Sequence, residues 1–414
     1  MTEALAILTA FVVVVLVGIF ASVLSKKLRV SNILLLILLG SVLSEAARFF
    51  GLAEIPHVAM VALSVIALAL IVFEGSSKFD FGSLNDFSFK AMLLVALFIL
   101  LNLIFLMPLY AFFFAPEPTL TAFLHGAIFA IIVIATDAAA VFYLLKDKVG
   151  RVMEFLEVES IINTPVIVIL PFLVLDFLGA VNAGTGLDWG VYGMNFLVQI
   201  IVGLGTGLLV GLLFFRVMKQ FYDQEISPLS LITSALLAYV LAENLEGSGV
   251  IAVAVLGFMF GNTYLAGKQS LASFNSMLSN SLEIIVFMLV GFIVSLRMPL
   301  ETYLYGFVAF LVIIFTRYAA VLLTVRKDGY SARERWFMIL VNPKGIATAV
   351  MVFSLSILAV DGLQLVLELI VLTIIYSVVV ATVVARYSHK FLPGDTPVVS
   401  NTASTDEGVI EVES

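Results

Sequence analysis

Two short polar stretches stand out in a chain that is otherwise strongly apolar. The first is Thr136-Asp137, and the second, one charged loop later, is the segment 159–164 (Glu-Ser-Ile-Ile-Asn-Thr), which ends at Pro165. Both lie inside long apolar segments, where an acidic side chain costs roughly 2.5–3.5 kcal/mol on insertion scales. A cost of that size favours a functional role, and the chemistry that it indicates is the binding of a cation or a proton inside a membrane.

The spacing of the second stretch brings its polar side chains together. Glu159 and Asn163 are four residues apart, as are Ser160 and Thr164, so on a helix they form one polar patch. Hydroxyls that bond back to their own helix and an amide that joins two helices are the structural alternative. At this depth, however, Glu159 needs a proton, a cation or a basic partner. We therefore expect an ion site made of Thr136, Asp137, Glu159, Ser160, Asn163 and Thr164.

Two basic residues lie in later apolar segments. Lys344 stands between Pro343 and Gly345, which suggests an interrupted helix, and it is too central to reach the interface easily. A buried lysine either pairs with an acid or loses its proton, and a buried arginine must pair because it keeps its charge. We expect Lys344 and Arg317 to compensate the acids of the site, although the sequence does not say which cation pairs with which acid.

The composition is that of a polytopic membrane protein. Of the 414 residues, 62% are hydrophobic and 12% are charged, against about 45–50% and about 25% in soluble domains. The chain has no cysteine, which excludes disulfides and thiolate metal sites. No metal-ligand spacing and no phosphate-binding glycine loop occurs, so we expect no enzyme chemistry, no cofactor and no metal beyond a transported monovalent cation. The scattered basic residues argue against nucleic acid, and the implied partner is the lipid bilayer.

The apolar segments are long enough to predict the number of membrane crossings. A spanning helix needs about 20 mostly apolar residues. Thirteen segments meet this condition, and the fold class that they predict is an all-α polytopic membrane protein. The segments are roughly 4–24, 31–46, 57–75, 88–114, 119–145, 153–177, 189–215, 226–243, 247–264, 270–296, 299–325, 333–358 and 362–388.

The loop charges test this count and give an orientation. With the N-terminus outside, only Arg48 and Arg297 fall at outer ends of the segments. Cytoplasmic ends are enriched in Lys and Arg, which predicts a multi-pass protein of the cell (plasma) membrane with a cytoplasmic C-terminus. The polar and acidic composition of 391–414 predicts a disordered cytoplasmic tail. The seventeen basic residues at inner ends are Lys26, Lys27, Arg29, Lys78, Lys90, Lys146, Lys148, Arg151, Arg216, Lys219, Lys268, Arg326, Lys327, Arg333, Arg335, Arg386 and Lys390.

Several landmarks in the same order resemble the monovalent cation:proton antiporters, in particular the sodium/proton exchanger branch. The similarity spans about residues 5–390. It implies a secondary transporter whose thirteen helices form two inverted repeats, with broken helices that cross in the core. The landmarks are Ala135-Thr136-Asp137, the segment 159–163, Phe73-Glu74-Gly75, the segment 248–252, Arg317 and Pro343-Lys344-Gly345.

The resemblance also implies a division of the transmembrane domain, about residues 1–390, into parts. The core would carry Na⁺, K⁺ or Li⁺ across the membrane in exchange for H⁺ by an elevator-type movement, and the protein would be a homodimer. The implied parts are a dimerisation part at about 1–87 and 226–298, a linker helix at about 189–215, and an ion-translocating core at about 88–177 and 299–388.

Three positions depart from the family pattern. Thr164 stands where the family has its main cation-binding and proton-binding acid, and Ala138 stands where it has a proline. Lys344 replaces an arginine that resembles a partner for Glu159. A hydroxyl can bind a cation but cannot carry a proton at physiological pH, so proton exchange would fall on Glu159 or Asp137. One possible cycle pairs Lys344 with Glu159 until an entering cation displaces the lysine.

Two other interpretations remain open at this point. The same fold could move an anion or an organic solute, because a lost carboxylate and a gained Lys344 lower the negative charge at the site. The chain could also be a non-transporting or partner-dependent membrane protein whose polar groups only join helices. Two further acids carry no firm assignment: Glu283, three residues after Asn280, either lines the pathway or pairs with a basic group, and we expect Glu74 at an interface.

Overall fold

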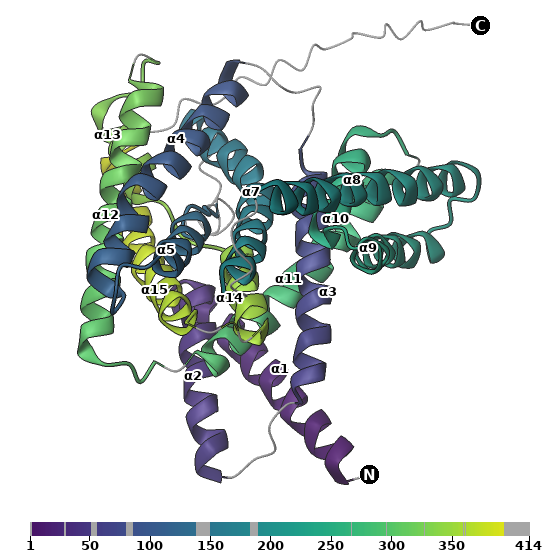
Figure 1. Cartoon of the computed structure of the whole chain (residues 1–414), viewed down its shortest axis with the longest axis horizontal. Coiled ribbons are helices and arrows are strands. Elements are labelled where there is room, and N and C mark those ends of the chain that lie inside the picture. Colours follow the sequence, from purple (N-terminus) through teal and green to yellow (C-terminus); the bar gives the residue numbers. More distant parts are fainter. Residues whose placement is uncertain are drawn as a thin grey trace, which may run out of the picture.

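The computed structural model of the chain is a bundle of α-helices (Figure 1). It describes residues 2–28, 30–50, 56–79, 86–137, 150–182, 189–265, 267–294, 296–326, 328–358, 360 and 362–392. This part of the chain contains fourteen α-helices, namely α1 (Thr2–Leu28), α2 (Asn32–Phe50), α3 (His57–Ser77), α4 (Asp86–Leu109), α5 (Leu120–Ile132), α7 (Arg151–Asn182), α8 (Trp189–Gln220), α9 (Ile226–Asn244), α10 (Gly249–Asn262), α11 (Lys268–Ile293), α12 (Leu300–Val325), α13 (Ala332–Leu340), α14 (Ile346–Leu358) and α15 (Gln364–Arg386).

The helices fall on the predicted segments. Within the described residues, ten helices are long and apolar enough to cross a membrane, and α5, α10 and α14 are shorter apolar helices. The predicted segment 333–358 is two helices, α13 and α14, because the chain is extended over 341–345. Residues 138–145 of the fifth predicted segment and 393–414 of the predicted tail lie outside the described residues.

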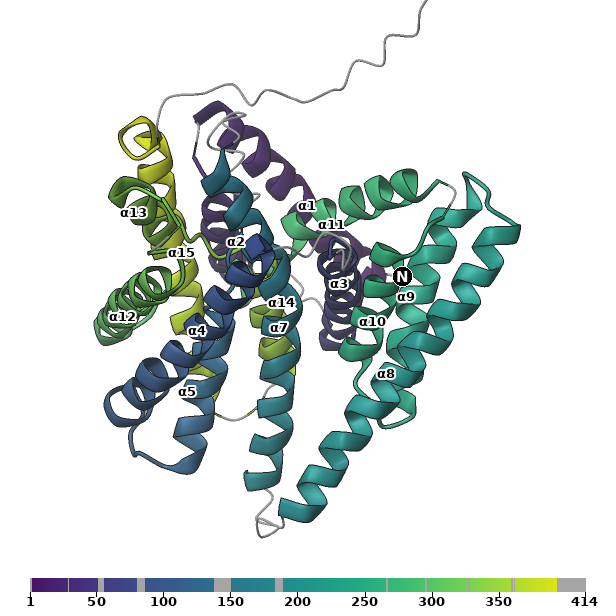
Figure 2. The same cartoon turned by 90° about the horizontal axis from the view of Figure 1, so that it is seen from above.

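The helices gather in two groups with a layer between them. In both views α4, α5, α12, α13 and α15 lie together on one side, and α8, α9 and α10 lie together on the other (Figures 1 and 2). Between the two groups α7 and α14 pass close to α3 and α11, and α14 packs on both α3 and α11. The site described below lies in this middle layer.

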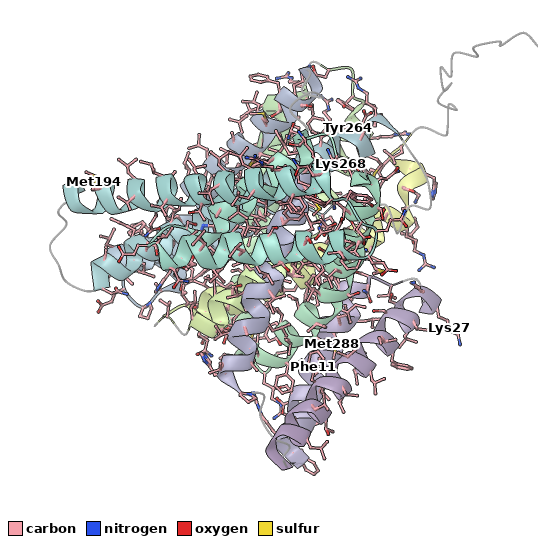
Figure 3. The ribbon with its side chains drawn as sticks, turned by 90° about the vertical axis from the view of Figure 1, so that its right-hand side faces the viewer. Phe11, Lys27, Met194, Tyr264, Lys268 and Met288 are labelled. Atoms are coloured by element: carbon pink, nitrogen blue, oxygen red, sulfur yellow. The ribbon has the colours of Figure 1, made fainter. Side chains whose placement is uncertain are left out.

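Small residues let several helices approach closely. Gly40 of α2 lies against the backbone of Met288 in α11, and Gly291 of α11 lies against the backbone of Ile37 in α2. A Cβ at either glycine would overlap a carbonyl oxygen, so the pairing of α2 with α11 depends on small residues, as is common in membrane helices. Figure 3 shows the side of the molecule that α8 and α9 cover, where these two helices run alongside each other, and α1 packs on α11, which carries Met288.

Side-chain caps fix where three helices begin. Thr119 accepts a hydrogen bond from the backbone N–H of Ala122 at the start of α5, and Ser248 does the same for Ile251 in α10. Ser331 and Glu334 form a capping box at the start of α13. The starts of α5 and α13 matter for the site, because each of these helices leads into an extended segment.

Candidate functional site

Two extended segments cross in the middle layer of the bundle. One covers residues 135–137, after a turn at 133–134 that follows α5, and the other separates α13 from α14 at residues 341–345. The N–H of Asp137 donates to the carbonyl oxygen of Pro343 at 2.9 Å, and the N–H of Lys344 donates to Ser377 Oγ at 3.2 Å. Non-helical backbone at membrane depth is tolerated where it is buried in protein or lines a cavity. The crossing meets both conditions.

A cavity of about 210 Å³ lies at this crossing. Lys78 and Glu157 are exposed at its rim, whereas Gly345 is buried at its base. The cavity is walled by α3, α7, α11, the end of the first extended segment and the start of α14, with lining residues Ile71, Glu74, Gly75, Lys78, Ala135, Thr136, Asp137, Glu157, Ser160, Ile161, Thr164, Ser279, Asn280, Glu283, Gly345, Ile346 and Ala347.

Asp137 lies against the first turn of α14. A Cβ at Gly345 would overlap the Asp137 carboxylate, so glycine is the residue that leaves room for it. The N–H groups at a helix N-terminus carry a partial positive charge and stabilise a nearby anion. The carboxylate therefore has electrostatic support from α14 while it faces the cavity.

The hydroxyl groups of the site hold α7 to the first extended segment. Asn163 Nδ2 donates to Thr136 Oγ1 at 2.6 Å, and Ser160 Oγ donates to the carbonyl oxygen of Thr136 at 2.8 Å. Thr164 Oγ1 donates to the carbonyl oxygen of Ser160 at 2.7 Å. Thr136, Ser160 and Thr164 line the cavity, and Asn163 is fully buried behind them.

Glu159 is held by Arg317, and both side chains have no exposed surface. Arg317 Nη1 binds Glu159 Oε1, and Nη2 donates to Oε2 at 2.7 Å, so the guanidinium binds both carboxylate oxygens. Arg317 Nε also donates to the carbonyl oxygen of Met338 at 3.3 Å, and the guanidinium lies 5.2 Å from the centre of the Phe98 ring. This buried pair joins α7 to α12 and α13.

The predicted polar patch therefore divides into two faces of α7. Successive residues of an α-helix are rotated by about 100°, so Ser160 and Thr164 face the cavity while Glu159 and Asn163 face the interior of the bundle. Of the residues expected to form one ion site, Glu159 and Asn163 therefore do not line the cavity. Of the four residues, Ser160 and Asn163 hydrogen-bond to Thr136 at the crossing, each from a different face of α7.

Lys344 is not the partner of Glu159 in this structure. The lysine is fully buried, its Nζ donates to Asn342 Oδ1 at 3.1 Å, and it lies 5.7 Å from the centre of the Phe98 ring. The planar guanidinium of Arg317 matches a carboxylate with two parallel hydrogen bonds, which an ammonium group cannot do. Lys344 is also absent from the cavity lining.

Acids without a firm assignment from the sequence also line the cavity. Glu74, expected at an interface, accepts a hydrogen bond from Ser276 Oγ at 2.9 Å and pairs with Lys78 at 2.9 Å. Glu283 and Ser279 reach the cavity from α11, four residues apart. The sequence signal for Glu283 was an acid in the middle of an apolar segment, but only the packing of α11 on α3 and α14 shows where it faces.

The chain matches the family described as sodium/hydrogen exchanger, transmembrane, over residues 11–387. It belongs to this family, and with its ten candidate spans among the described residues it is a multi-pass membrane protein.

Individual relatives agree with this assignment. The chain is 28% identical over 279 residues to the K(+)/H(+) antiporter NhaP2 of Shewanella sp. strain MR-4, which covers 65% of the chain and 48% of that relative. It is 25% identical over 387 residues to the K(+)/H(+) antiporter NhaP2 of Shewanella baltica strain OS223, which covers 91% of the chain and 66% of that relative. The chain thus spans about half to two thirds of the length of these curated relatives.

A solved structure confirms the predicted fold class. The structure of the sodium proton antiporter MjNhaP1 from Methanocaldococcus jannaschii at pH 8 superposes with a TM-score of 0.75 at 19% sequence identity. The match covers 92% of this chain and 100% of that one. The all-α polytopic fold expected from the apolar segments is therefore correct.

Proposed function

We propose that this chain is a secondary transporter that exchanges a monovalent cation, Na⁺ or K⁺, for protons. The observation that carries the proposal is the Asp137 carboxylate in the cavity where two interrupted helices cross. Broken helices of this kind supply cation ligands in other transporters, because their helix ends and freed carbonyls face the site. Relatives of the chain carry names such as K(+)/H(+) antiporter and low-affinity Na(+)/H(+) antiporter.

In this proposal the cation binds among oxygen atoms at the crossing. Asp137 supplies a carboxylate, and Thr136, Ser160 and Thr164 supply hydroxyl or carbonyl oxygens, ligands that suit hard cations. Asn163 holds the Thr136 hydroxyl in place. Glu159 and Arg317 act as a buried pair that fixes α7 behind the site, and Lys344 adds a second buried basic group there.

The lining of the cavity favours a cation over an anion or an organic acid. Its acidic residues are Glu74, Asp137, Glu157 and Glu283, whereas Lys78 is its basic residue and already pairs with Glu74. The reason for considering an anion was that Lys344 lowers the negative charge of the site. Lys344 does not line the cavity, so its charge does not support the binding of an anion there.

For the transport movement we propose that residues 88–177 and 299–388 move as a core against 1–87 and 226–298. The helix at about 189–215 would link the two parts within a homodimer, in an elevator-type alternating-access cycle. The crossing segments both belong to the proposed core, so Asp137 and its surroundings would move together. We further propose that the N-terminus lies outside the cell and the C-terminus in the cytoplasm, on the basis of the basic residues at the inner helix ends.

Exchange in proteoliposomes tests this function. The purified wild type should convert a gradient of Na⁺ or K⁺ into a pH change inside the vesicles. Asp137→Asn should reduce this exchange to the background of empty vesicles, because the variant lacks the carboxylate at the crossing. Glu154→Gln, an exposed position at the start of α7, is the matched control and should keep the wild-type rate.

The same assay identifies the outcomes that contradict the proposal. A wild type that produces no cation-coupled pH change with either ion would rule out the exchanger function. Chloride counterflow in those vesicles would instead favour the anion alternative. Full activity of Asp137→Asn would exclude Asp137 as a ligand that the cycle needs.

A further inference from the structure

Helix α11 brings two polar side chains to the cavity from the side opposite the crossing. Ser279 and Glu283 are four residues apart, so they lie on one face of the helix, and both line the cavity together with Asp137. Asn280, next to Ser279, lines it as well. None of these side chains belongs to the polar stretches around Asp137 and Thr164 from which the site was predicted.

The Ser279 hydroxyl is in an unusual state for a buried polar group. The side chain is 2% exposed, and its Oγ has no hydrogen-bond partner among the residues that the structure describes. Buried polar atoms are nearly always hydrogen-bonded, so an unpaired one beside a cavity has a free hydrogen-bonding or ligating position. An oxygen atom in this position suits a cation or a water bound to one.

The Glu283 carboxylate forms no ion pair with a basic side chain among the described residues. Within the part of the chain that the structure describes, no Lys or Arg side chain lies within 4.0 Å of it. The other charged groups in the cavity are Asp137, Glu157 and the Glu74–Lys78 pair. The other helices packed against α11 place their described titratable side chains toward helix ends, and α14 has none. These side chains are Lys26 and Lys27 of α1, Glu45 and Arg48 of α2, His57 of α3, and Tyr239 and Glu243 of α9.

We propose that Glu283 and Ser279 complete the cation and proton site of Asp137, and that Glu283 fills the role of the acid that Thr164 lacks. This inference rests on the proposed exchange function and names the second acid at which the cation and the proton compete. Two carboxylates that face one cavity repel each other when both are charged, so they favour holding either one shared proton or one cation between them. Ser279 Oγ adds a neutral ligand to the bound cation.

The chemistry balances as a one-for-one exchange. With one proton the Asp137–Glu283 pair carries a net charge of −1, and with one monovalent cation it again carries −1. Entry of the cation therefore releases one proton to the water in the cavity, and no net charge moves in the step. Because Glu283 lies in the proposed dimerisation part and Asp137 in the proposed core, the pair would exist only while the cavity is open at this face. Asp137 would then carry the cation or the proton across with the core.

Two measurements on the purified full chain test the inference. The first is the rise in melting temperature with added NaCl or KCl over a range of pH, with choline chloride as the salt control; the second is exchange in proteoliposomes. For Glu283→Gln we expect the cation concentration for half-maximal stabilisation to rise by about tenfold or more, because one of two carboxylates is lost. In this variant the cation concentration for half-maximal stabilisation should depend less steeply on pH. The rate of exchange in proteoliposomes should fall by about tenfold or more.

Three further variants keep the result interpretable. Glu283→Asp keeps the carboxylate and should remain within about threefold of the wild type in both measurements. Ser279→Ala should weaken cation stabilisation while the dependence on pH is kept, because it removes a ligand but no proton carrier. Glu225→Gln, an exposed residue just before α9, is the matched control and should match the wild type.

The possible results separate this inference from the proposed function. Wild-type stabilisation, pH dependence and exchange in Glu283→Gln would overturn the inference and leave the exchange function intact. A wild type that binds cations in competition with protons through Glu283 but exchanges nothing would support the site and reject the function. If Glu283→Gln does not fold, a Ser279→Ala variant with unchanged cation stabilisation would overturn the inference, because Ser279 would then not be a ligand of the cation.

Discussion

The pair of Glu159 and Arg317 is the ion pair with no exposed side-chain surface among the described residues. Neither side chain has exposed surface, and the guanidinium contacts both carboxylate oxygens as well as the backbone of α13. Removing one partner of a buried pair leaves an uncompensated charge, whereas a pair at the surface contributes little. We therefore expect Glu159 to act mainly on stability, and Asp137 and Glu283 mainly on transport.

We predict that Glu159→Gln lowers the free energy of unfolding by about 3–5 kcal/mol, because Arg317 then keeps a buried charge without a counter-ion. Thermal unfolding of the detergent-purified protein measures this as a lower melting temperature. Glu154→Gln, exposed on the same helix, should change stability by about 0.5 kcal/mol or less. A stable Glu159→Gln variant that has lost only cation binding would show that Glu159 is a ligand after all.

The sequence identified acids and hydroxyls of the site but not the direction in which each of them faces. The insertion cost of an acid marked Glu159, Asp137 and Glu283 equally. Spacing grouped Glu159 with Ser160, and the two faces of α7 separated only when its neighbours were known: Arg317 on one side and the cavity on the other. A helical pattern gives the angle between two side chains, while tertiary packing decides which of them meets water.

At the level of elements, the two interrupted helices differ in how visible they are in the sequence. Pro343 lacks an N–H and Gly345 lacks a side chain, so a break over 341–345 is predictable. Nothing comparable marks the end of α5 at Ile132. The extended conformation after it is stabilised by partners distant in the chain, since Asp137 bonds to Pro343 and Thr136 bonds to α7.

We predict that Gly345→Ala disrupts the site while the rest of the fold is kept. The added methyl group would overlap the Asp137 carboxylate, and overpacking of this kind typically costs about 1–3 kcal/mol. Cation-driven proton flux in proteoliposomes should fall by about tenfold or more, because the carboxylate must leave the start of α14. Gly205→Ala in α8, whose Cβ would meet no atom within 4 Å, should keep its activity. Wild-type flux in Gly345→Ala would place the functional carboxylate elsewhere.

At the scale of the whole molecule, apolar length was sufficient for the positions of the apolar segments and for the fold class. It predicts each crossing from its own residues, with no knowledge of its neighbours. The way in which the helices group together cannot be predicted from each segment on its own. It depends on contacts such as Gly40 with Met288 and Gly291 with Ile37, which join segments about 250 residues apart. The proposed division into moving and fixed parts needs an experiment of its own.

A reversible cross-link between α3 and α14 provides that experiment. Ser64 Oγ and Ser354 Oγ lie 2.9 Å apart, both are buried, and they belong to the parts that we propose to move against each other. The chain has no cysteine, so Ser64→Cys with Ser354→Cys introduces a single possible disulfide by two conservative replacements. If the parts move, oxidation of the double variant should stop proton exchange and reduction should restore it, while each single variant stays active under both conditions. Exchange that continues at the wild-type rate in the fully cross-linked protein would mean that α3 and α14 keep their contact throughout the cycle, and the moving part would then have to be smaller than the proposed core.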